Sequence, residues 1–199
     1  RIKPIDPSAP VVPPHEEAKA KEAAVRDLRK EIALMQNILG FGQHPNLIKV
    51  LAYDDGPDPK LALELCENGS LLALAKEARG REQEWFGQLE RYACDIARGM
   101  AFLEANAFVH RDLAARNILV DSSMRAKIAD FGLARDVAGA DDAAYTRNKY
   151  GNVESNPTAW KWTAPEGLNE DLYTIKSDVW SYGILLAELC QFGRKPYLD

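Results

Sequence analysis

The sequence predicts an α+β protein of two lobes, with a small N-terminal lobe of one helix and strands and a mainly helical C-terminal lobe. In the first third, a stretch with helical periodicity precedes two short apolar runs that flank a turn. In the remainder, two long stretches repeat their apolar residues at every third or fourth position. We place the boundary after residue 66, so that residues 1–66 and 67–199 form the two lobes.

The overall composition narrows the classes of function. A chain of 199 residues can bury one sizeable core or two small ones. Its net charge of -5 argues against nucleic-acid binding, which needs a basic face. No apolar run approaches the roughly 20 residues that cross a bilayer, and the 3 scattered cysteines suit reduced thiols. We therefore predict a cytoplasmic location, and we leave open that the chain is the intracellular part of a membrane receptor.

The N-terminal elements follow from local sequence. Residues 4–14 carry five prolines and are predicted to be an extended loop. Residues 16–39 are predicted to form a helix that Gly40 ends, because apolar residues recur there with helical spacing. Residues 47–53 and 60–65 are predicted to pair as a hairpin around an Asp-Asp-Gly-Pro turn.

The C-terminal elements are mostly helical. Ser70 is a suitable cap for a short helix over residues 71–78, and residues 84–105 have the pattern of a longer helix with one apolar face. Residues 177–189 are apolar nearly all round, which predicts a helix that is buried on every side.

Two short strands in the middle of the chain carry the candidate chemistry. Residues 118–120 and 126–128 are predicted to pair antiparallel around the turn between them. In the predicted register, Asn117 lies opposite Asp130 at the open end of the hairpin. An amide oxygen beside a carboxylate suits Mg²⁺, which takes few protein ligands and completes its shell with water and phosphate oxygens.

Asp112 adds a carboxylate to this candidate site. It precedes Asn117 by five residues and lies in a predicted loop, so it can reach the same end of the hairpin. This pattern suits a reaction in which a metal holds a polyphosphate and a free carboxylate orients an incoming hydroxyl. Taken singly, Asp112 and Asp130 are better interpreted as turn formers and Asn117 as a strand cap. The convergence of all three favours the site.

Four segments resemble the motifs of one protein family, in that family's order. They are HRDLAARN at 110–117, DFG at 130–132, APE at 164–166 and SDVWSYGILLAEL at 177–189. The chain thus resembles a eukaryotic protein kinase catalytic domain of the tyrosine kinase group, over nearly its whole length. The resemblance implies a protein-kinase-like two-lobed fold that transfers the ATP γ-phosphate to protein tyrosine hydroxyls, with ATP and Mg²⁺ bound.

The resemblance also implies roles for the central residues. Asp112 is implied to be the catalytic base, and Asn117 and Asp130 are implied to hold Mg²⁺. Arg111 is implied to steady a phosphorylated activation loop, and Arg116 to act beside Asp112 in the catalytic loop.

An ATP-binding set follows from the same resemblance. LELCENGSL at 63–71 is similar to the segment that joins the two kinase lobes, which we call the hinge. Leu63 is the implied gatekeeper, and Glu64 and Cys66 are implied to offer backbone groups to adenine. Leu119 is implied to lie beneath the adenine ring.

Glu31 is implied to pair with the strand lysine that grips the ATP phosphates. A solvated surface glutamate is about as good an interpretation from the sequence alone. The upstream residue that best resembles the phosphate-gripping lysine is Lys3. Lys19 and Lys21 rank lower because they lie in helical context.

The resemblance favours tyrosine over serine or threonine as the acceptor. The cation of the catalytic loop is Arg116, and Trp162 stands just before the APE motif, as in tyrosine kinases. Ala159 departs from the family, which usually has proline there, so the substrate platform is expected to be reshaped. A tyrosine-kinase-like serine/threonine or dual-specificity kinase stays open. A pseudokinase scaffold also stays open, although three intact central residues argue against it.

The activation segment carries two candidate phosphorylation sites, Tyr145 and Tyr150. Protein substrates that bear tyrosine are the expected partners, nucleic acid is not, and a dimer for trans-autophosphorylation is left open. The family's glycine-rich loop and its last helices are missing from the sequence, which is therefore expected to be a kinase domain truncated at both ends. Such a fragment is expected to be weakly active or inactive alone.

Overall fold

The computed structural model describes residues 14–137, 144–146 and 159–197. Lys3, Tyr150 and nearly all of the proline-rich stretch lie outside the described residues. The elements in chain order are α1 (Pro14–Gly40), β1 (Val50–Asp54), β2 (Lys60–Leu63), α2 (Leu71–Glu77), α3 (Glu82–Ala105), β3 (Phe108–Val109), the 3-10 helix η1 (Ala115–Asn117), β4 (Ile118–Val120), β5 (Ala126–Ile128), β6 (Arg135–Asp136), β7 (Ala144–Thr146), the 3-10 helix η2 (Ala159–Lys161), α4 (Pro165–Glu170), β8 (Leu172–Thr174) and α5 (Ile175–Cys190).

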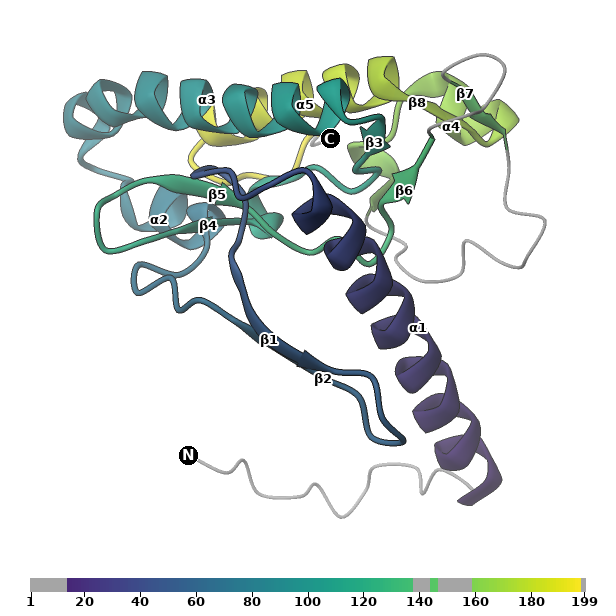
Figure 1. Cartoon of the computed structure of the whole chain (residues 1–199). Helices are drawn as coiled ribbons and strands as arrows, with labels where there is room; N and C mark the ends of the chain where they lie inside the picture. The colour runs from purple at the N-terminus through teal and green to yellow at the C-terminus, as the bar shows by residue number, and fades with distance from the viewer. Residues whose placement is uncertain (1–13, 138–143, 147–158, 198–199) are drawn as a thin grey trace.

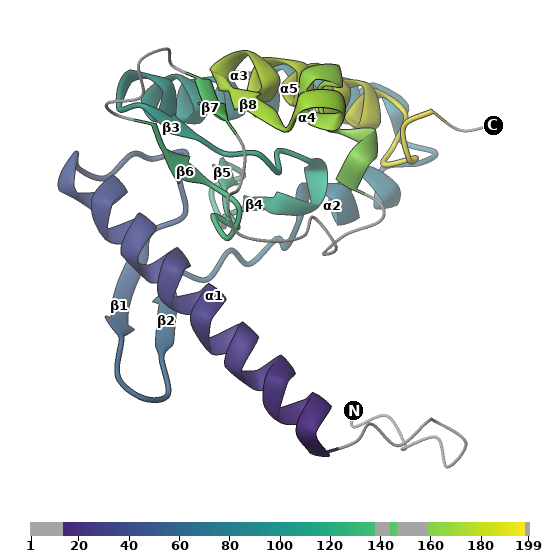
Figure 2. The same ribbon diagram turned by 90° about the vertical axis from the view of Figure 1, so that its right-hand side faces the viewer.

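The described strands form small separate sheets. Each sheet is a two-stranded antiparallel pair, and the pairs are β1–β2, β3–β6, β4–β5 and β7–β8. Helices α3 and α5 lie side by side along one side of the body, whereas α1 and the β1–β2 hairpin project from the opposite side (Figures 1 and 2). This mixture confirms the predicted α+β class. Within the described ranges, no helix combines the length and apolar character needed to cross a membrane.

The main core lies between α3, α5 and the β4–β5 hairpin. Its fully buried side chains come from all three elements and include Tyr92, Ile96, Leu103, Ile118, Ile128, Leu185 and Leu189. The long helix α3 thereby supports the hairpin that carries the candidate site.

Helix α1 confirms the helix that was predicted over residues 16–39. Its C-terminal half buries a stripe of Ile32, Met35 and Ile38. The N-terminal half extends away from the body (Figure 2). Just beyond the helix, Gly42 adopts a φ of 105°, a conformation that glycine takes without steric cost.

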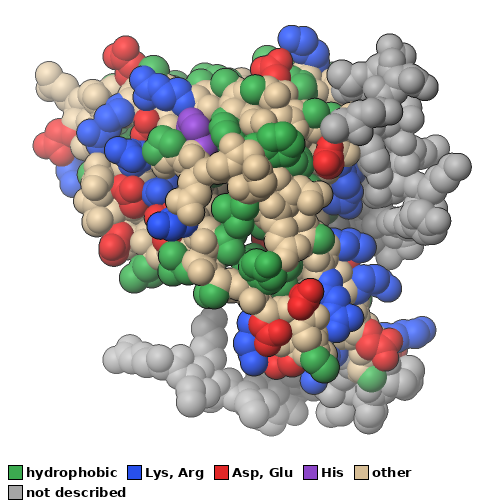
Figure 3. Space-filling view, in the orientation of Figure 1, with side chains coloured by type: hydrophobic (Ala, Val, Ile, Leu, Met, Phe, Trp, Pro, Cys, Tyr) green, Lys and Arg blue, Asp and Glu red, His purple; other side chains and the backbone are tan. Residues whose placement is uncertain are grey.

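Charged side chains of both signs cover the projecting part of the molecule (Figure 3). Arg29 of α1 donates from Nη2 to the carbonyl oxygen of Gly56 at 2.8 Å. This contact ties the turn of the β1–β2 hairpin to the middle of α1.

A short loop connects α1 to the body beside the candidate site. The Ile128 N–H donates to the Asn46 carbonyl at 2.8 Å, and the Ile48 N–H donates to the Ile128 carbonyl at 2.8 Å. Gly99 of α3 allows this close approach, because an added Cβ would lie 2.7 Å from Ile128 Cδ1 and 2.9 Å from Asn46 O. The loop after α1 is therefore held directly against β5.

The β1–β2 hairpin, α2 and α3 confirm their predictions to within a few residues. The Ser70 side chain accepts a hydrogen bond from the Ala73 N–H at 3.2 Å, as expected of an N-cap. Thr174 caps α5 in the same way, and Ser177 completes a capping box with it.

The predicted register of the β4–β5 hairpin is wrong by one residue. Asn117 lies opposite Ala129, whose N–H donates to the Asn117 carbonyl at 2.9 Å, and not opposite Asp130. Residues 122–124 form the loop between the strands, and Met124, the last of them, adopts a left-handed φ of 59°. Loops of this length place their last residue in that conformation, which shifts the pairing from the predicted centre.

The prediction that α5 is buried on every side is also wrong. Val179 and Trp180 are 56% and 43% exposed, whereas Asp178, Ser181 and Glu188 are buried. The polar residues of α5 lie on its buried face because they hydrogen-bond to the segments that precede β4 and α4.

Candidate active site

The backbone of the 110–117 loop is held by a buried carboxylate from α5. Asp178 accepts a hydrogen bond from the His110 N–H at 2.7 Å and another from the Arg111 N–H at 2.9 Å. These bonds hold Arg111 at a φ of 70°, a conformation that is costly for a residue with a side chain. Burial raises the pKa of Asp178, and His110 and the two N–H donors oppose that shift.

His110 is fully buried, and its side chain stabilises the 110–117 loop through hydrogen bonds. Its Nδ1 accepts from the Asp112 N–H at 3.3 Å, so the ring proton is assigned to Nε2, which donates to the Ala129 carbonyl at 3.2 Å. The imidazole also packs against the Phe131 ring, with 5.2 Å between ring centroids. His110 therefore links the 110–117 loop to the residues on either side of Asp130.

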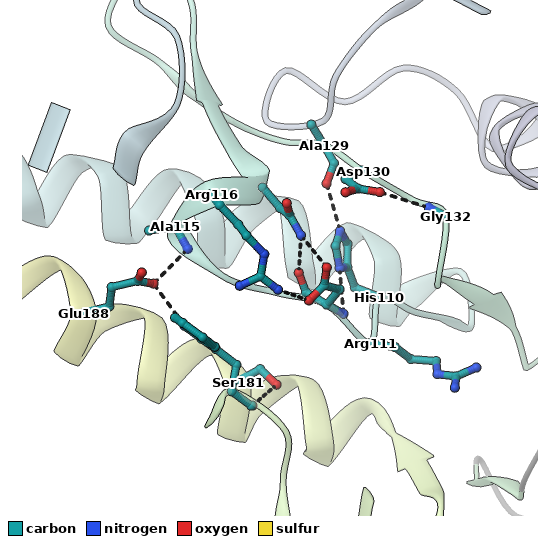
Figure 4. Close-up of polar contacts among 12 residues, drawn as sticks. His110, Arg111, Ala115, Arg116, Ala129, Asp130, Gly132, Ser181 and Glu188 are labelled. Carbon is teal, nitrogen blue, oxygen red and sulfur yellow. Dashed lines mark hydrogen bonds and ion pairs between the residues drawn. The ribbon is translucent and has the colours of Figure 1, made fainter. Parts of the chain in front are cut away.

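The polar contacts of the 110–117 loop converge on Asp112. Figure 4 labels its partner Arg116 and its neighbours His110 and Arg111. Asn117 donates from Nδ2 to the Asp112 carbonyl oxygen at 2.7 Å and to its Oδ2 at 2.8 Å. Arg116 donates from Nη2 to Oδ1 of Asp112 and forms an ion pair with it. Burial raises the pKa of Asp112, while the Arg116 charge and the Asn117 bond oppose the rise. Both carboxylate oxygens of Asp112 are thus fixed in direction.

Asp130 adds negative charge beside Asp112, and Glu31 adds negative charge beside Asp130. Asp130 is exposed at a φ of 61°, and its Oδ1 accepts from the Gly132 N–H at 3.4 Å. Burial raises the pKa of Glu31, the charge of Asp130 adds to the rise, and the Phe131 N–H opposes it. The charge of Asp130 also contributes to the raised pKa of Asp112, so Asp130 lies close enough to repel both Asp112 and Glu31.

Asn117 and Asp130 fit a Mg²⁺ site that phosphate and water complete. The amide nitrogen of Asn117 is engaged by Asp112, which leaves its oxygen for a cation. A cation beside Asp130 relieves the repulsion among the carboxylates. In the part of the chain that the structure describes, no group of three His, Cys, Asp or Glu side chains could hold a metal. Two protein ligands are what Mg²⁺ commonly uses at phosphate sites.

The hinge presents a donor and an acceptor side by side. The Glu64 N–H donates to the Lys49 carbonyl at 2.9 Å, and the Cys66 carbonyl accepts from the Gly69 N–H at 3.1 Å. Among the described residues, the Glu64 carbonyl and the Cys66 N–H therefore have no backbone partner. One acceptor next to one donor complements the hydrogen-bonding edge of adenine.

The two leucines expected around adenine both lie next to the hinge. Leu63 ends β2 and is 37% exposed. Leu119 lies half-buried in β4, which runs beside the end of the hinge through a bridge between Leu119 and Ser70. The structure thus brings both side chains to the segment that follows β2.

Lys127 is a buried cation beneath the hinge that sequence reasoning did not single out. Its Nζ lies 2.9 Å from Oε1 of Glu64 and 3.9 Å from Oδ2 of Asp121. The same Glu64 oxygen accepts from the Lys49 N–H at 2.7 Å. Lys127 and Phe131 also line a cavity of about 290 Å³. Asp112 does not line this cavity. The sequence signal that could have identified Lys127 was its position as a charged residue within an apolar strand pattern.

Arg111 contacts the strand pair β7–β8, to which Tyr145 belongs. The guanidinium carbon of Arg111 lies 4.2 Å from the centre of the Tyr173 ring. The backbone of Tyr173 in β8 pairs with that of Tyr145 in β7. The expected phosphorylation site at Tyr145 therefore lies on β7, next to the strand whose Tyr173 ring contacts Arg111. The other expected site, Tyr150, lies outside the described residues.

Trp162 lies beneath Arg116, with 4.9 Å between the guanidinium carbon and the ring centre. The indole Nε1–H donates to Oε2 of Glu188 at 3.0 Å, and the Trp162 carbonyl accepts from Ser181 Oγ at 2.8 Å. Sequence reasoning missed Asp178, Ser181 and Glu188. Their signal was the recurrence of polar residues on one face of an apolar helix.

The chain matches a known protein family over most of its length. A family model described as protein tyrosine and serine/threonine kinase matches residues 12–199. The chain belongs to this kinase family. The resemblance and the kinase-like α+β fold predicted from the motifs are thereby confirmed.

Several relatives of this kinase chain are named tyrosine-protein kinases. Human Srms is 39% identical over 180 residues, which cover 90% of this chain and 34% of Srms. The csk-1 protein of Caenorhabditis elegans is 43% identical over 160 residues, which cover 77% of this chain and 27% of csk-1. SRK3 of Spongilla lacustris is 39% identical over 174 residues, which cover 87% of this chain and 48% of SRK3. The chain thus spans less than half the length of each of these relatives.

Proposed function

We propose that this kinase chain carries the catalytic centre of a protein tyrosine kinase that uses ATP and Mg²⁺. The observation that carries the proposal is the fixed orientation of Asp112. Asn117 and Arg116 hold its two carboxylate oxygens, and Asp130 lies close enough to influence its charge. A carboxylate so placed is suited to accept the proton of a substrate hydroxyl during phosphate transfer.

Each residue near Asp112 has a proposed role. Asn117, through its free oxygen, and Asp130 hold Mg²⁺, which neutralises charge on the ATP phosphates when it is bound. Glu31 accepts the Phe131 N–H and is available to a lysine that binds phosphate. We keep Lys3 as the candidate for that lysine, although it lies outside the described residues.

The adenine site is proposed at the hinge. The Glu64 carbonyl accepts from the adenine amine, and the Cys66 N–H donates to the ring. Leu119 packs beneath the base, and Leu63 stands at the back of the site as gatekeeper. The Lys127–Glu64 ion pair supports this site because it fixes the hinge against β5.

Tyrosine is the proposed acceptor. Arg116 lies against the Trp162 ring while it binds Asp112, and we propose that a phenol ring enters in front of this pair. The names of the three relatives support the same acceptor. Serine or threonine is the second candidate, because the matching family model covers both kinds of kinase.

The wider setting is proposed from the same observations. Substrates are proteins that bear tyrosine, and dimerisation serves autophosphorylation in trans at Tyr145 or Tyr150. A cytoplasmic location agrees with the three free cysteines. We keep the proposed lobe boundary after residue 66, which lies within the hinge segment 63–71.

The experiment compares acceptors. The full-length protein is incubated with radiolabelled ATP and Mg²⁺, and either a glutamate–tyrosine copolymer or a basic serine peptide. We expect transfer to the copolymer alone, and its loss when EDTA is added. Transfer to serine alone would overturn the choice of tyrosine. A folded protein that transfers to neither substrate would identify a pseudokinase scaffold.

A further inference from the structure

Glu188 is a buried carboxylate that contacts two separate parts of the active site. It lies on the inner face of α5 and is 4% exposed. Its Oε2 accepts a hydrogen bond from the Ala115 N–H at 3.0 Å and another from Trp162 Nε1–H at 3.0 Å (Figure 4). Ala115 belongs to the 110–117 loop, whereas Trp162 belongs to the segment that precedes α4.

A short chain of contacts leads from Glu188 to the reacting centre. The Trp162 ring lies beneath the guanidinium of Arg116 at 4.9 Å, and Arg116 binds Oδ1 of Asp112. A carboxylate that accepts the indole N–H increases the electron density of the ring, which strengthens its attraction for the Arg116 cation. The negative charge of Glu188 also acts on Arg116 directly.

We propose that Glu188 is a positioning residue that sets the distance between the 110–117 loop and the Trp162 segment, and thereby delivers the substrate tyrosine to Asp112. The proposal rests on the proposed kinase function. Because one oxygen atom receives both donors, neither Ala115 nor Trp162 can shift without losing its bond. The loop and the Trp162 segment are thus held to a common point on α5.

The cost of burying this group argues that it does more than fill space. A carboxylate transferred into an apolar interior is destabilising unless it is fully hydrogen-bonded. Ser181, about two turns earlier on the same face of α5, already anchors the Trp162 carbonyl at 2.8 Å. Glu188 adds the connection to the 110–117 loop that Ser181 does not make.

The proposal predicts an effect on the protein substrate rather than on the nucleotide. Among the described residues, Glu188 makes no hydrogen bond to Asn117, Asp130 or the hinge, so we expect nucleotide binding to be independent of it. The test uses the full-length protein with Glu188→Ala, Glu188→Gln and Trp162→Phe. Peptide phosphorylation gives kcat and KM, and a fluorescent ATP analogue gives the nucleotide Kd.

We expect Glu188→Ala to lower kcat/KM for a tyrosine peptide about 10²-fold, because a small displacement of the substrate from Asp112 slows transfer by about this factor. The nucleotide Kd is expected to stay within about twofold of the wild-type value. Glu188→Gln retains an oxygen that accepts both bonds and is expected to recover part of the loss. Trp162→Phe keeps a ring under Arg116 but lacks the N–H, so its effect is expected to be less than additive with Glu188→Gln. The control is Glu104→Gln, an exposed carboxylate on α3, which is expected to change neither quantity.

Three results would overturn the inference: an unchanged kcat/KM in a folded Glu188→Ala protein, an equal loss of nucleotide binding and peptide turnover, or full additivity with Trp162→Phe. Failure of the proposed function is recognised separately, because the wild-type protein would then phosphorylate no peptide. Circular dichroism of each variant establishes that it is folded.

Discussion

Asn117 directs both hydrogens of one amide nitrogen at Asp112, one to its backbone carbonyl at 2.7 Å and one to its Oδ2 at 2.8 Å. The nitrogen therefore has no further hydrogen to give, and the oxygen of the same amide faces away from Asp112. One side chain can thus orient the proposed base and offer a ligand to a cation. This double use explains why an amide, and not a carboxylate, suits position 117.

Replacing Asn117 with Asp separates these two uses. Asn117→Asp keeps an oxygen for Mg²⁺ but removes both donors and places another negative charge beside Asp112. We expect the Mg²⁺ requirement to persist while the rate of phosphate transfer falls about 10²-fold, because the base is no longer held in place. A Mg²⁺ titration of initial rates in the full-length protein measures both effects. The control is Asn37→Asp, on the exposed face of α1. A variant with wild-type rates would contradict the orienting role.

Removing the carboxylate of Asp178 is expected to destabilise the fold. Asp178→Ala leaves two buried N–H groups, those of His110 and Arg111, without an acceptor. We expect the free energy of unfolding to fall by about 3 kcal/mol, measured by urea denaturation. Asp27→Ala, which breaks an exposed ion pair with Lys30, is the control and is expected to cost less than about 0.5 kcal/mol. Equal effects of the two substitutions would show that Asp178 does not hold the loop.

The ion pair beneath the hinge is expected to support both stability and nucleotide binding. Lys127→Met leaves Glu64 partly buried without its cation, so we expect a loss of about 2 kcal/mol in unfolding free energy and a higher KM for ATP. Lys60→Met, which removes only an exposed pair with Asp58, is the matched control. The double variant Lys127→Met/Glu64→Leu should regain part of the lost stability, since it removes the unpaired charge. A double variant no more stable than Lys127→Met would count against the pair.

Glu188 is expected to make stability depend on pH. Burial raises its pKa, and the bonds from Ala115 and Trp162 offset the rise only in part. The folded state therefore binds this proton more tightly than the unfolded state. Its contribution to stability is complete below the unfolded pKa and is lost as pH rises through the folded pKa. Glu188→Gln cannot titrate, so wild type should gain stability relative to it as pH falls from about 7 to about 4. Urea denaturation at several pH values measures the difference, and a constant difference would refute this origin.

Phosphate is expected on the activation segment. The strand that contains Tyr145 pairs with β8, whose Tyr173 ring lies against Arg111. A phosphate in this neighbourhood would gain a cation and stabilise the segment. Mass spectrometry of the full-length protein after incubation with ATP and Mg²⁺ should find phosphate on Tyr145 or Tyr150. An Asp112→Asn protein incubated alone should carry none. An active protein that remains unmodified on both tyrosines would contradict the prediction.

The parts of the fold that depend on local pattern could be predicted from the sequence. Helix α1 and the Ser70 cap were predictable because their spacing and capping chemistry lie within a few neighbouring residues. The position of Asn117 opposite Ala129 was not, because the left-handed turn at Met124 has no marker in the residue type.

The parts that depend on distant partners could not be predicted. In the sequence, Glu188 is only a charged residue within an apolar helix. Its role depends on donors from Ala115 and Trp162, which are distant in the sequence. Lys127 likewise meets Glu64 only through folding. The central residues of the candidate site were predictable, since Asp112, Asn117 and Asp130 lie close in sequence. The hydrogen bonds from α5 that hold the 110–117 loop could not be predicted, because they join residues far apart in the sequence.

The most direct test of the proposed mechanism is a single-turnover measurement of phosphate transfer by Asp112→Asn in the full-length protein. The substrate is a tyrosine peptide, and both proteins are saturated with ATP and Mg²⁺, with nucleotide binding checked separately. If Asp112 is the base, the variant should bind nucleotide as the wild type does and transfer phosphate at least about 10²-fold more slowly. Transfer at the wild-type rate by a folded, nucleotide-bound Asp112→Asn protein would contradict the central claim.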